Sequence, residues 1–238
     1  MWCVVGTKRV AQKIAKRCEK LGIQAEPFPL VYQVVNENIK DELQRITELD
    51  TSVFTSVSAV KLVFKNASLR LKKEISRSTC FTIGPATSES VTQVFHCKNL
   101  FVAQPYSSLG LIKLIGEKKL GRCALFSSLK RSTELVNHLK KRCDVLYEPK
   151  LYDLSVDEKV LHKLENKLIQ KNYFGYVFTC STAVYALANL LGKTNANFVA
   201  MGPRTASALS QLGVKCYTPN SYDVDGVVSL ISVLSTRN

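Results

Sequence analysis

The sequence predicts an α/β protein made of two similar domains, each a parallel sheet flanked by helices. Short apolar strands alternate with amphipathic helices along all 238 residues, which is the pattern of parallel sheets. A short signature also occurs twice: FTSVSAV at 54–60 is followed by GPAT at 84–87, and FTCSTAV at 178–184 by GPRT at 202–205. Each copy predicts a strand, a hydroxyl-rich turn, a helix, a second strand and a further helix. Two copies indicate two similar domains.

The first half of the chain begins with a strand over residues 3–6 and a helix starting at Thr7. Apolar residues recur at helical spacing up to Leu21, and Gly22 ends the helix. Prolines in 27–35 exclude a helix there, so this stretch is predicted to be an extended strand or linker. The alternation continues with a helix over 39–49, a strand over 52–55, a helix over 60–71, a strand over 80–83, a helix over 87–95, a strand over 100–103 and a helix over 109–116.

At Gly121 the same order of elements starts again, which makes the chain a tandem duplication. The second half is predicted to contain a strand over 122–126, a helix around 135–139, an extended stretch over 144–148, a helix from Ser155, a strand over 214–217 and a helix from about Asp225. Ser155 and Glu158 match a capping box. The stretches 27–35 and 147–154 are equivalent in the repeat, and each is long enough to bridge two domains.

The charge of the chain favours a ligand that carries negative charge. Lysine and arginine total 33 against 19 acidic residues, giving a net charge of +14. Such a field attracts nucleic acid, an acidic membrane, or a small substrate with several carboxylates or phosphates. A basic surface that serves only solubility is the alternative.

Signals for a metal, a cofactor or a membrane are missing from the sequence. Eight cysteines and three histidines are scattered without a C-x-x-C pair, so we expect no metal site. The nucleotide-binding and hydrolase motifs are also missing, and we expect no cofactor. Because there is no signal peptide and no apolar run of ~18 residues, we expect a cytoplasmic protein that does not act in a membrane.

The two Gly-Pro-x-Thr turns are the first candidate ligand sites. Glycine allows the tight turn, and proline suits the first helical position because its missing N–H would lack a partner there. The next N–H groups leave the helix end beside a hydroxyl, which suits a carboxylate or phosphate. These groups lie at 86–88 (Ala-Thr-Ser) in the first copy and at 204–206 (Arg-Thr-Ala) in the second. Plain helix capping is the alternative for either copy.

Hydroxyl groups also follow one predicted strand in each copy. They are Thr55, Ser56 and Ser58 in the first copy and Thr179 and Ser181, with Cys180 between them, in the second. Ligands of open α/β sheets bind at the carboxyl ends of strands, so these side chains either bind a ligand or cap the next helix. At Cys180 a packed or spectator thiol is favoured over a nucleophile, because no histidine is near it in the sequence.

A basic pair follows the first strand of each repeat, Lys8-Arg9 and Lys130-Arg131. Arginine binds carboxylates through two parallel hydrogen bonds, which makes Arg9 and Arg131 candidates for a carboxylate clamp. The alternative is a solvated first helical turn, and it fits the lysines better than the arginines.

Together these segments resemble the uroporphyrinogen-III synthase family. The resemblance rests on the two signatures, on KLY at 150–152, on LGV at 212–214 and on their order over the full chain. Two turns depart from the family pattern. The family commonly has Thr-Ser-Pro-Ser where this chain has TCST at 179–182, and a glycine near an arginine where it has SSLKR at 127–131. The role of Arg131 at the second turn is therefore open.

The resemblance implies how the repeats are divided into domains. In the family the chain leaves the first domain early, builds the second and returns through a two-stranded linker, with the active cleft between the domains. Residues 1–31 plus 153–238 would form the first domain, 35–149 the second, and 32–34 with 150–152 the linker strands. A simple cut between the repeats near residue 120 would then be wrong.

The resemblance also implies the reaction. It is the cyclisation of hydroxymethylbilane, a linear tetrapyrrole with eight carboxylates, with inversion of the last ring and loss of water, on the way to haem, sirohaem or corrinoids. Tyr152 maps onto a family tyrosine that faces the cleft, and it would donate a hydrogen bond to the departing hydroxyl. A tyrosine that only packs in the linker is the alternative. The implied substrate-binding residues are Arg9, Thr55, Ser56, Ser58, Ala86, Thr87, Ser127, Arg131, Thr179, Cys180, Ser181, Arg204 and Thr205.

Two other functions are compatible with parts of the sequence. A non-catalytic two-domain clamp would bind some other polyanion with the same groups. Nucleic-acid binding would explain the charge but not the duplicated turns, and the chain lacks a basic stripe interleaved with aromatic residues. We expect a monomer whose partner is a small tetrapyrrole polycarboxylate, with no nucleic acid and no membrane.

Overall fold

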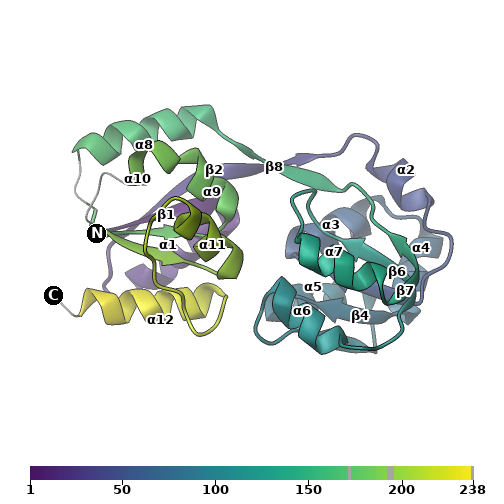
Figure 1. Cartoon of the computed structure of the whole chain (residues 1–238). Helices are drawn as coiled ribbons and strands as arrows, with labels where there is room; N and C mark the ends of the chain where they lie inside the picture. The colour runs from purple at the N-terminus through teal and green to yellow at the C-terminus, as the bar shows by residue number, and fades with distance from the viewer. Residues whose placement is uncertain (171–172, 192–195, 237–238) are drawn as a thin grey trace. The chain divides into compact units, whose positions relative to one another are not determined.

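The computed structural model describes residues 1–170, 173–191 and 196–236, and it divides the chain into two compact units (Figure 1). The first unit is Met1–Gln33 with Leu154–Asn238, and the second unit is Val34–Asp153. The described residues of each unit build a five-stranded sheet with helices packed against it. The predicted fold class, two similar α/β domains with parallel sheets, is confirmed.

The sheet of the first unit has the strand order β10-β9-β1-β2-β8. Its strands are β1 (Trp2–Thr7), β2 (Ala25–Val35), β8 (Tyr152–Val156), β9 (Gly175–Phe178) and β10 (Asn197–Ala200). The neighbours among β1, β2, β9 and β10 pair in parallel. The helices of this unit are α1 (Lys8–Glu19), α8 (Glu158–Gln170), α9 (Ser181–Ala186), α10 (Ala188–Leu191), α11 (Pro203–Gln211) and α12 (Val224–Ser235).

The alternation of side chains along β1 fixes which helices cover which face of this sheet. Trp2 and Val4 point to one face, where they pack with residues of α1 and α12. Cys3 and Val5 point to the other face, where they pack with residues of α8, α9 and α11. Because β1 is covered on both faces, it is apolar throughout instead of alternating with polar residues.

The sheet of the second unit has the order β5-β4-β3-β6-β7, and its neighbours pair in parallel. Its strands are β3 (Thr51–Phe54), β4 (Thr79–Thr82), β5 (Leu100–Val102), β6 (Gly121–Phe126) and β7 (Cys143–Tyr147). Its helices are α2 (Ile39–Gln44), α3 (Val57–Asn66), α4 (Leu69–Arg77), α5 (Pro85–Phe95), α6 (Ser108–Ile115) and α7 (Thr133–Lys140). Val53 and Leu125 pack against α6 and α7, whereas Phe54 and Phe126 stack on the other face with ring centroids 4.7 Å apart.

The two sheets place equivalent strands in the same order. The order β4-β3-β6-β7 in the second unit corresponds to β10-β9-β1-β2 in the first, as the sequence repeat requires. Where the second unit continues with β5, the first has a single parallel bridge between Val199 and Tyr217. The strand predicted over 214–217 is therefore reduced to this bridge. The boundaries between the units fall within β2 and β8, which are neighbours in the first sheet.

Three predicted helices differ from the structure. The helix expected over 39–49 ends at Gln44, and Ile46 and Leu49 are buried in the non-helical stretch that follows it. The single helix expected over 60–71 is two helices, α3 and α4, because Ala67 is extended and Ser68 begins a new cap by accepting a hydrogen bond from the Leu71 N–H at 3.2 Å. The capping box at Ser155 is wrong, because Ser155 lies in β8. The carboxylate of Asp157 caps α8 instead, accepting from the N–H groups of Lys159 and Val160 at 3.0 and 3.1 Å.

The described helices are all too short or too polar to cross a membrane.

Candidate functional site

The predicted site residues gather at the carboxyl-terminal edge of the sheet in each unit. The strands of each sheet end in register at this edge. In the first unit Phe178 pairs with Val5 and with Ala200. In the second unit Phe54 pairs with Thr82 and with Phe126. The turns that follow these strands are therefore brought side by side. The first-unit edge carries Arg9, Thr179, Cys180, Ser181, Arg204 and Thr205, and the second-unit edge carries Thr55, Ser56, Ser58, Ala86, Thr87, Ser127 and Arg131.

Tyr152 lies at the edge of the second unit and is held there at both ends. Its hydroxyl is 2.9 Å from the hydroxyl of Ser56, which also accepts the Ala59 N–H at 3.0 Å as the N-cap of α3. Its carbonyl accepts the Leu129 N–H at 2.8 Å, and its backbone forms a parallel bridge with Ser128. The side chain of Tyr152 is thus fixed between the turns that follow β3 and β6.

Burial keeps the Tyr152 hydroxyl protonated. The residue is 5% exposed, and removal from water raises the pKa of its hydroxyl above the ordinary value, while hydrogen bonds with Ser56 and Ser128 oppose the rise. A phenol with a raised pKa remains a hydrogen-bond donor throughout the neutral range. It can donate to an oxygen that leaves or gains negative charge.

The turn at Gly84 presents donors at the start of α5. Gly84 is the N-cap and Pro85 the first helical residue, and the cap has no side-chain hydrogen bond. The N–H groups of Thr87 and Ser88 both donate to the Gly84 carbonyl, at 3.1 and 3.0 Å, so they are not available as predicted. Among the described residues, the Ala86 N–H and the buried Thr87 hydroxyl have no hydrogen-bond partner.

The first unit repeats this turn at Gly202. The Thr205 N–H donates to the Gly202 carbonyl at 3.0 Å, as does the Ala206 N–H. The Thr205 side chain is 5% exposed, and within the described part of the chain its hydroxyl has no hydrogen-bond partner. In both units the threonine hydroxyl, not the threonine N–H, is therefore the donor that a ligand can use.

Thr179 is placed by a close approach to Gly6. A Cβ atom on Gly6 would lie 1.7 Å from the Thr179 Oγ1, so only glycine leaves room for this hydroxyl above the end of β1. The Thr179 N–H donates to the Val5 carbonyl at 3.0 Å. Cys180 and Ser181 follow, both half-buried, with Cys180 as the N-cap of α9. Gly6 is a site residue that the sequence analysis missed, and a glycine ending a buried strand was its signal.

Most of the remaining candidate residues of the second unit already have hydrogen-bond or ion-pair partners within the protein. The Thr55 hydroxyl lies 3.5 Å from the Phe126 carbonyl, and the buried Ser127 hydroxyl donates to the Ser128 carbonyl at 3.0 Å. Arg131 is paired with Glu148 at 3.2 Å, and its side chain is only 14% exposed. Ser58 is half-buried in the first turn of α3.

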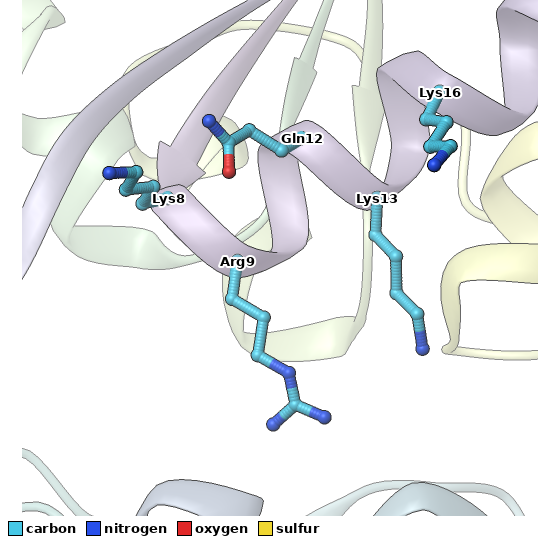
Figure 2. Close-up of a pocket in the computed structure, with 5 residues that line it drawn as sticks. All are labelled: Lys8, Arg9, Gln12, Lys13 and Lys16. Carbon is cyan, nitrogen blue, oxygen red and sulfur yellow. The ribbon is translucent and has the colours of Figure 1, made fainter.

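Arg9 lies in a different environment from Arg131. It is exposed in the first turn of α1, where it borders a shallow hollow of about 480 Å³ with Lys8, Gln12, Lys13 and Lys16 (Figure 2). Among the described residues Arg9 has no ion-pair partner. The two arginines that the repeat relates are therefore not equivalent.

A second repeated feature was missed by the sequence analysis. Tyr106 packs beside Gly84, and Tyr222 beside Gly202, so that a Cβ atom on either glycine would lie 3.4 or 3.7 Å from the tyrosine Cβ. Each tyrosine is followed by a capping residue: Ser107 accepts from the Gly110 N–H at 3.1 Å, and Asp223 from the Gly226 N–H at 2.8 Å. The signal was the shared pattern Tyr-x-x-x-Gly before an apolar helix, YSSLG and YDVDG.

The described residues include no group of three or more histidine, cysteine, aspartate or glutamate side chains placed to hold a metal ion. The chemistry available at these edges is hydrogen bonding from hydroxyl and N–H groups to anionic oxygens.

Comparisons with known proteins point to one family. The family model of uroporphyrinogen-III synthase HemD matches residues 12–229. A protein of Methanocaldococcus jannaschii, provisionally named a uroporphyrinogen-III synthase, is 24% identical over 243 residues, covering 97% of each chain. A mutant uroporphyrinogen III synthase from the bacterium Thermus thermophilus aligns with a TM-score of 0.71 at 18% identity, covering 100% of this chain and 99% of that one.

The uroporphyrinogen-III synthetase of Helicobacter pylori aligns with a TM-score of 0.62 at 16% identity, over 98% of both chains. These two structures show the shared fold. The family model spans most of the sequence, and on that ground the chain belongs to the uroporphyrinogen-III synthase family.

Proposed function

We propose that this chain cyclises hydroxymethylbilane to uroporphyrinogen III, with Tyr152 as the catalytic residue. The observation that carries the proposal is the environment of the Tyr152 hydroxyl. This group is buried, its pKa is raised by burial, and it lies 2.9 Å from the Ser56 hydroxyl at the carboxyl-terminal edge of the second sheet. Membership of the family supports the reaction.

The reaction needs a hydroxyl group to leave, the last ring to be inverted and the macrocycle to close. The hydroxymethyl C–O bond breaks as the pyrrole nitrogen donates its electron pair, and the oxygen departs as water, leaving an azafulvene cation. The substituted α-carbon of the last ring attacks this cation and gives a spiro intermediate. The bond from that carbon to the bridge carbon of the third ring then breaks, and the bridge carbon bonds to the free α-carbon of the last ring, which is now inverted. The proton lost from that α-carbon balances the proton that the leaving oxygen takes up as water. Tyr152 donates a hydrogen bond to the departing oxygen, and the resulting stabilisation is largest as the C–O bond breaks.

The carboxylates of the substrate are bound at the strand-end edges. Thr87 and Thr205 offer hydroxyls without partners among the described residues, and the Ala86 N–H adds a backbone donor at a helix start. Arg9 and Arg204 add positive charge nearby, whereas the charge of Arg131 is paired with Glu148. The same edges are bordered by Thr55, Ser56, Ser58, Ser127, Thr179, Cys180 and Ser181. Since these groups orient rather than activate the substrate, they contribute by fixing its conformation.

The test is product analysis with freshly prepared hydroxymethylbilane. Spontaneous ring closure gives the type I isomer, so we expect an excess of type III over a control without enzyme. Tyr152→Phe removes only the hydroxyl, and we expect kcat for type III to fall roughly 100-fold with substrate affinity retained. Tyr185→Phe, which alters an exposed tyrosine of α9, is the matched control and should keep full activity.

Absence of type III product with the unaltered protein would contradict the proposal and favour a non-catalytic clamp for a polyanion. If Tyr152→Phe is as active as Tyr185→Phe, the catalytic role proposed for Tyr152 is contradicted, but the proposed activity of the protein is not.

We also propose that the protein works as a cytoplasmic monomer without nucleic acid or membrane. All the groups named above belong to one chain, so no second copy is needed to complete the site. Its cysteines are free thiols, which suits a reducing compartment. Sedimentation of the purified protein checks the monomer, and filter binding to duplex DNA at physiological salt checks the statement on nucleic acid.

A further inference from the structure

We propose that the exposed face of α1 is an additional binding surface for carboxylates of the same linear tetrapyrrole, with Lys13 and Lys16 as contact residues. The proposal rests on the proposed function, because it extends the first-unit edge beyond Arg9. It assigns a role to two lysines that neither the repeat nor the duplicated turns single out.

The packing of α1 determines which side chains face outward. Ala11, Ile14 and Cys18 are buried against the sheet and α12, and Ala15 is also buried. The opposite face presents Lys8, Arg9, Gln12, Lys13 and Lys16, which line the hollow of about 480 Å³. Figure 2 shows Arg9 and Lys13, one helical turn apart, extending from the helix in the same direction. From Lys8 to Lys16 this basic face covers about 12 Å along the helix axis.

The charge on this face is not neutralised within the described part of the chain. Lys8, Arg9, Lys13 and Lys16 have no carboxylate partner there. The first turn of α1 contains no acidic residue, and the N-cap Thr7 makes no side-chain hydrogen bond to the helix. The positive end of the helix dipole therefore adds to the side-chain charge.

The repeat provides an internal comparison. Lys130 and Arg131 hold the positions equivalent to Lys8 and Arg9. The Lys130 ammonium lies 4.0 Å from the Asp153 carboxylate, and the Arg131 guanidinium lies 3.2 Å from the Glu148 carboxylate. The helix that follows them, α7, has Glu134 in its first turn. In the second unit this basic pair precedes α7 and is matched by carboxylates. Among the described residues, the equivalent pair at the start of α1 has no carboxylate partner.

The chemistry of the face favours carboxylates on short flexible arms. Ammonium groups at helical spacing contact separate carboxylates one by one. The residues that line the hollow include no aromatic ring, which single-stranded nucleic acid would use for stacking. The basic face also starts at Lys8, directly after β1, so it continues the edge that carries Thr179. A ligand bound at that edge can place further carboxylates along α1.

The experiment compares three double variants with the unaltered protein. Lys13→Gln/Lys16→Gln removes the two charges. Lys13→Arg/Lys16→Arg keeps them. Lys159→Gln/Lys163→Gln removes the same charge from exposed positions on α8 of the same unit. Each protein is assayed for kcat and KM of type III formation, and for the Kd of uroporphyrin III, with eight carboxylates, and coproporphyrin III, with four, at low and at physiological salt.

For Lys13→Gln/Lys16→Gln we expect KM and the uroporphyrin Kd to rise about 2- to 30-fold, the range that two exposed ion pairs give. The change should be smaller for coproporphyrin and should shrink as salt is added. We expect kcat to be unchanged, the arginine variant to resemble the unaltered protein, and the α8 control to show little effect.

Equal losses in the α1 and α8 variants would overturn the proposal, since they would show a general effect of net charge. Unchanged KM and Kd in Lys13→Gln/Lys16→Gln would overturn it as well. Both results leave the proposed function intact, because they require that the unaltered protein makes type III product. Failure of the proposed function appears separately, as the absence of that product.

Discussion

The surroundings of Tyr152 determine what chemistry its side chain can offer. Its hydroxyl hydrogen-bonds with Ser56, whose own position is fixed because it caps α3. KLY in the sequence indicated a family residue, but nothing in the sequence placed Ser56 beside it, because the two residues are 96 positions apart. A contact at that separation follows from the order of strands in the sheet, not from a local pattern. The same holds for Thr179 above Gly6.

The buried hydroxyl has a measurable effect on stability at alkaline pH. The pKa of Tyr152 is raised in the folded protein, so above pH ~10 the unfolded chain loses this proton first and the free energy of unfolding falls as pH rises. We expect Tyr152→Phe to lose stability less steeply between about pH 9 and pH 11, by up to ~1.4 kcal/mol per pH unit. Urea unfolding of both proteins at the two pH values measures this, and equal slopes would contradict a protonated, buried Tyr152.

At the level of elements, sequence reasoning succeeded where the pattern is local and repeated. Apolar strands, amphipathic helices and the two Gly-Pro turns were all predictable, and the turns do open α5 and α11. The start of α8 was not. Ser155 and Glu158 fit a capping box by spacing, but β8 extends through Val156 because the Asp157 N–H donates to the Leu30 carbonyl at 2.9 Å. Pairing with β2 overrode the local cap.

The corrected cap gives an expected difference between neighbouring residues. Asp157→Ala removes the acceptor for two helix N–H groups and should cost about 1 kcal/mol of stability, with the helix dipole adding to the loss. Ser155→Ala should cost less than about 0.5 kcal/mol, because its hydroxyl caps nothing. Denaturant midpoints of the two variants provide the measurement. A larger loss for Ser155→Ala would restore the cap expected from sequence.

At the scale of the whole molecule, the duplication accounts for the order of the strands and for the two separate cores. Each unit packs its own apolar residues on both faces of its sheet. The sequence repeat predicted two similar bodies. The division of the chain between them was implied by the family resemblance, because the equivalent order of β10-β9-β1-β2 and β4-β3-β6-β7 requires strands that are distant in the chain.

Because the two cores are separate, we expect a destabilising core substitution in one unit to leave the stability of the other unit unchanged. Leu125→Ala opens a cavity in the second unit and should destabilise it by about 2–5 kcal/mol. Trp2 is the only tryptophan of the chain and is buried in the first unit, so its fluorescence reports that unit alone. We expect the urea transition seen by circular dichroism to shift or split, while the Trp2 transition stays in place. Equal shifts in both signals would show a single cooperative unit.

The interrupted first unit has a consequence for synthesis on the ribosome. The second unit is one continuous segment, whereas β1 lies between β2 and β9, and β9 is translated only after that segment is complete. At about 5–20 residues per second the delay is roughly 7–30 s. During this time the apolar side chains of Trp2, Val4 and Val5 lack the strand and helices that cover them later. The nascent N-terminal segment is therefore a natural client for chaperones that shield exposed apolar strands.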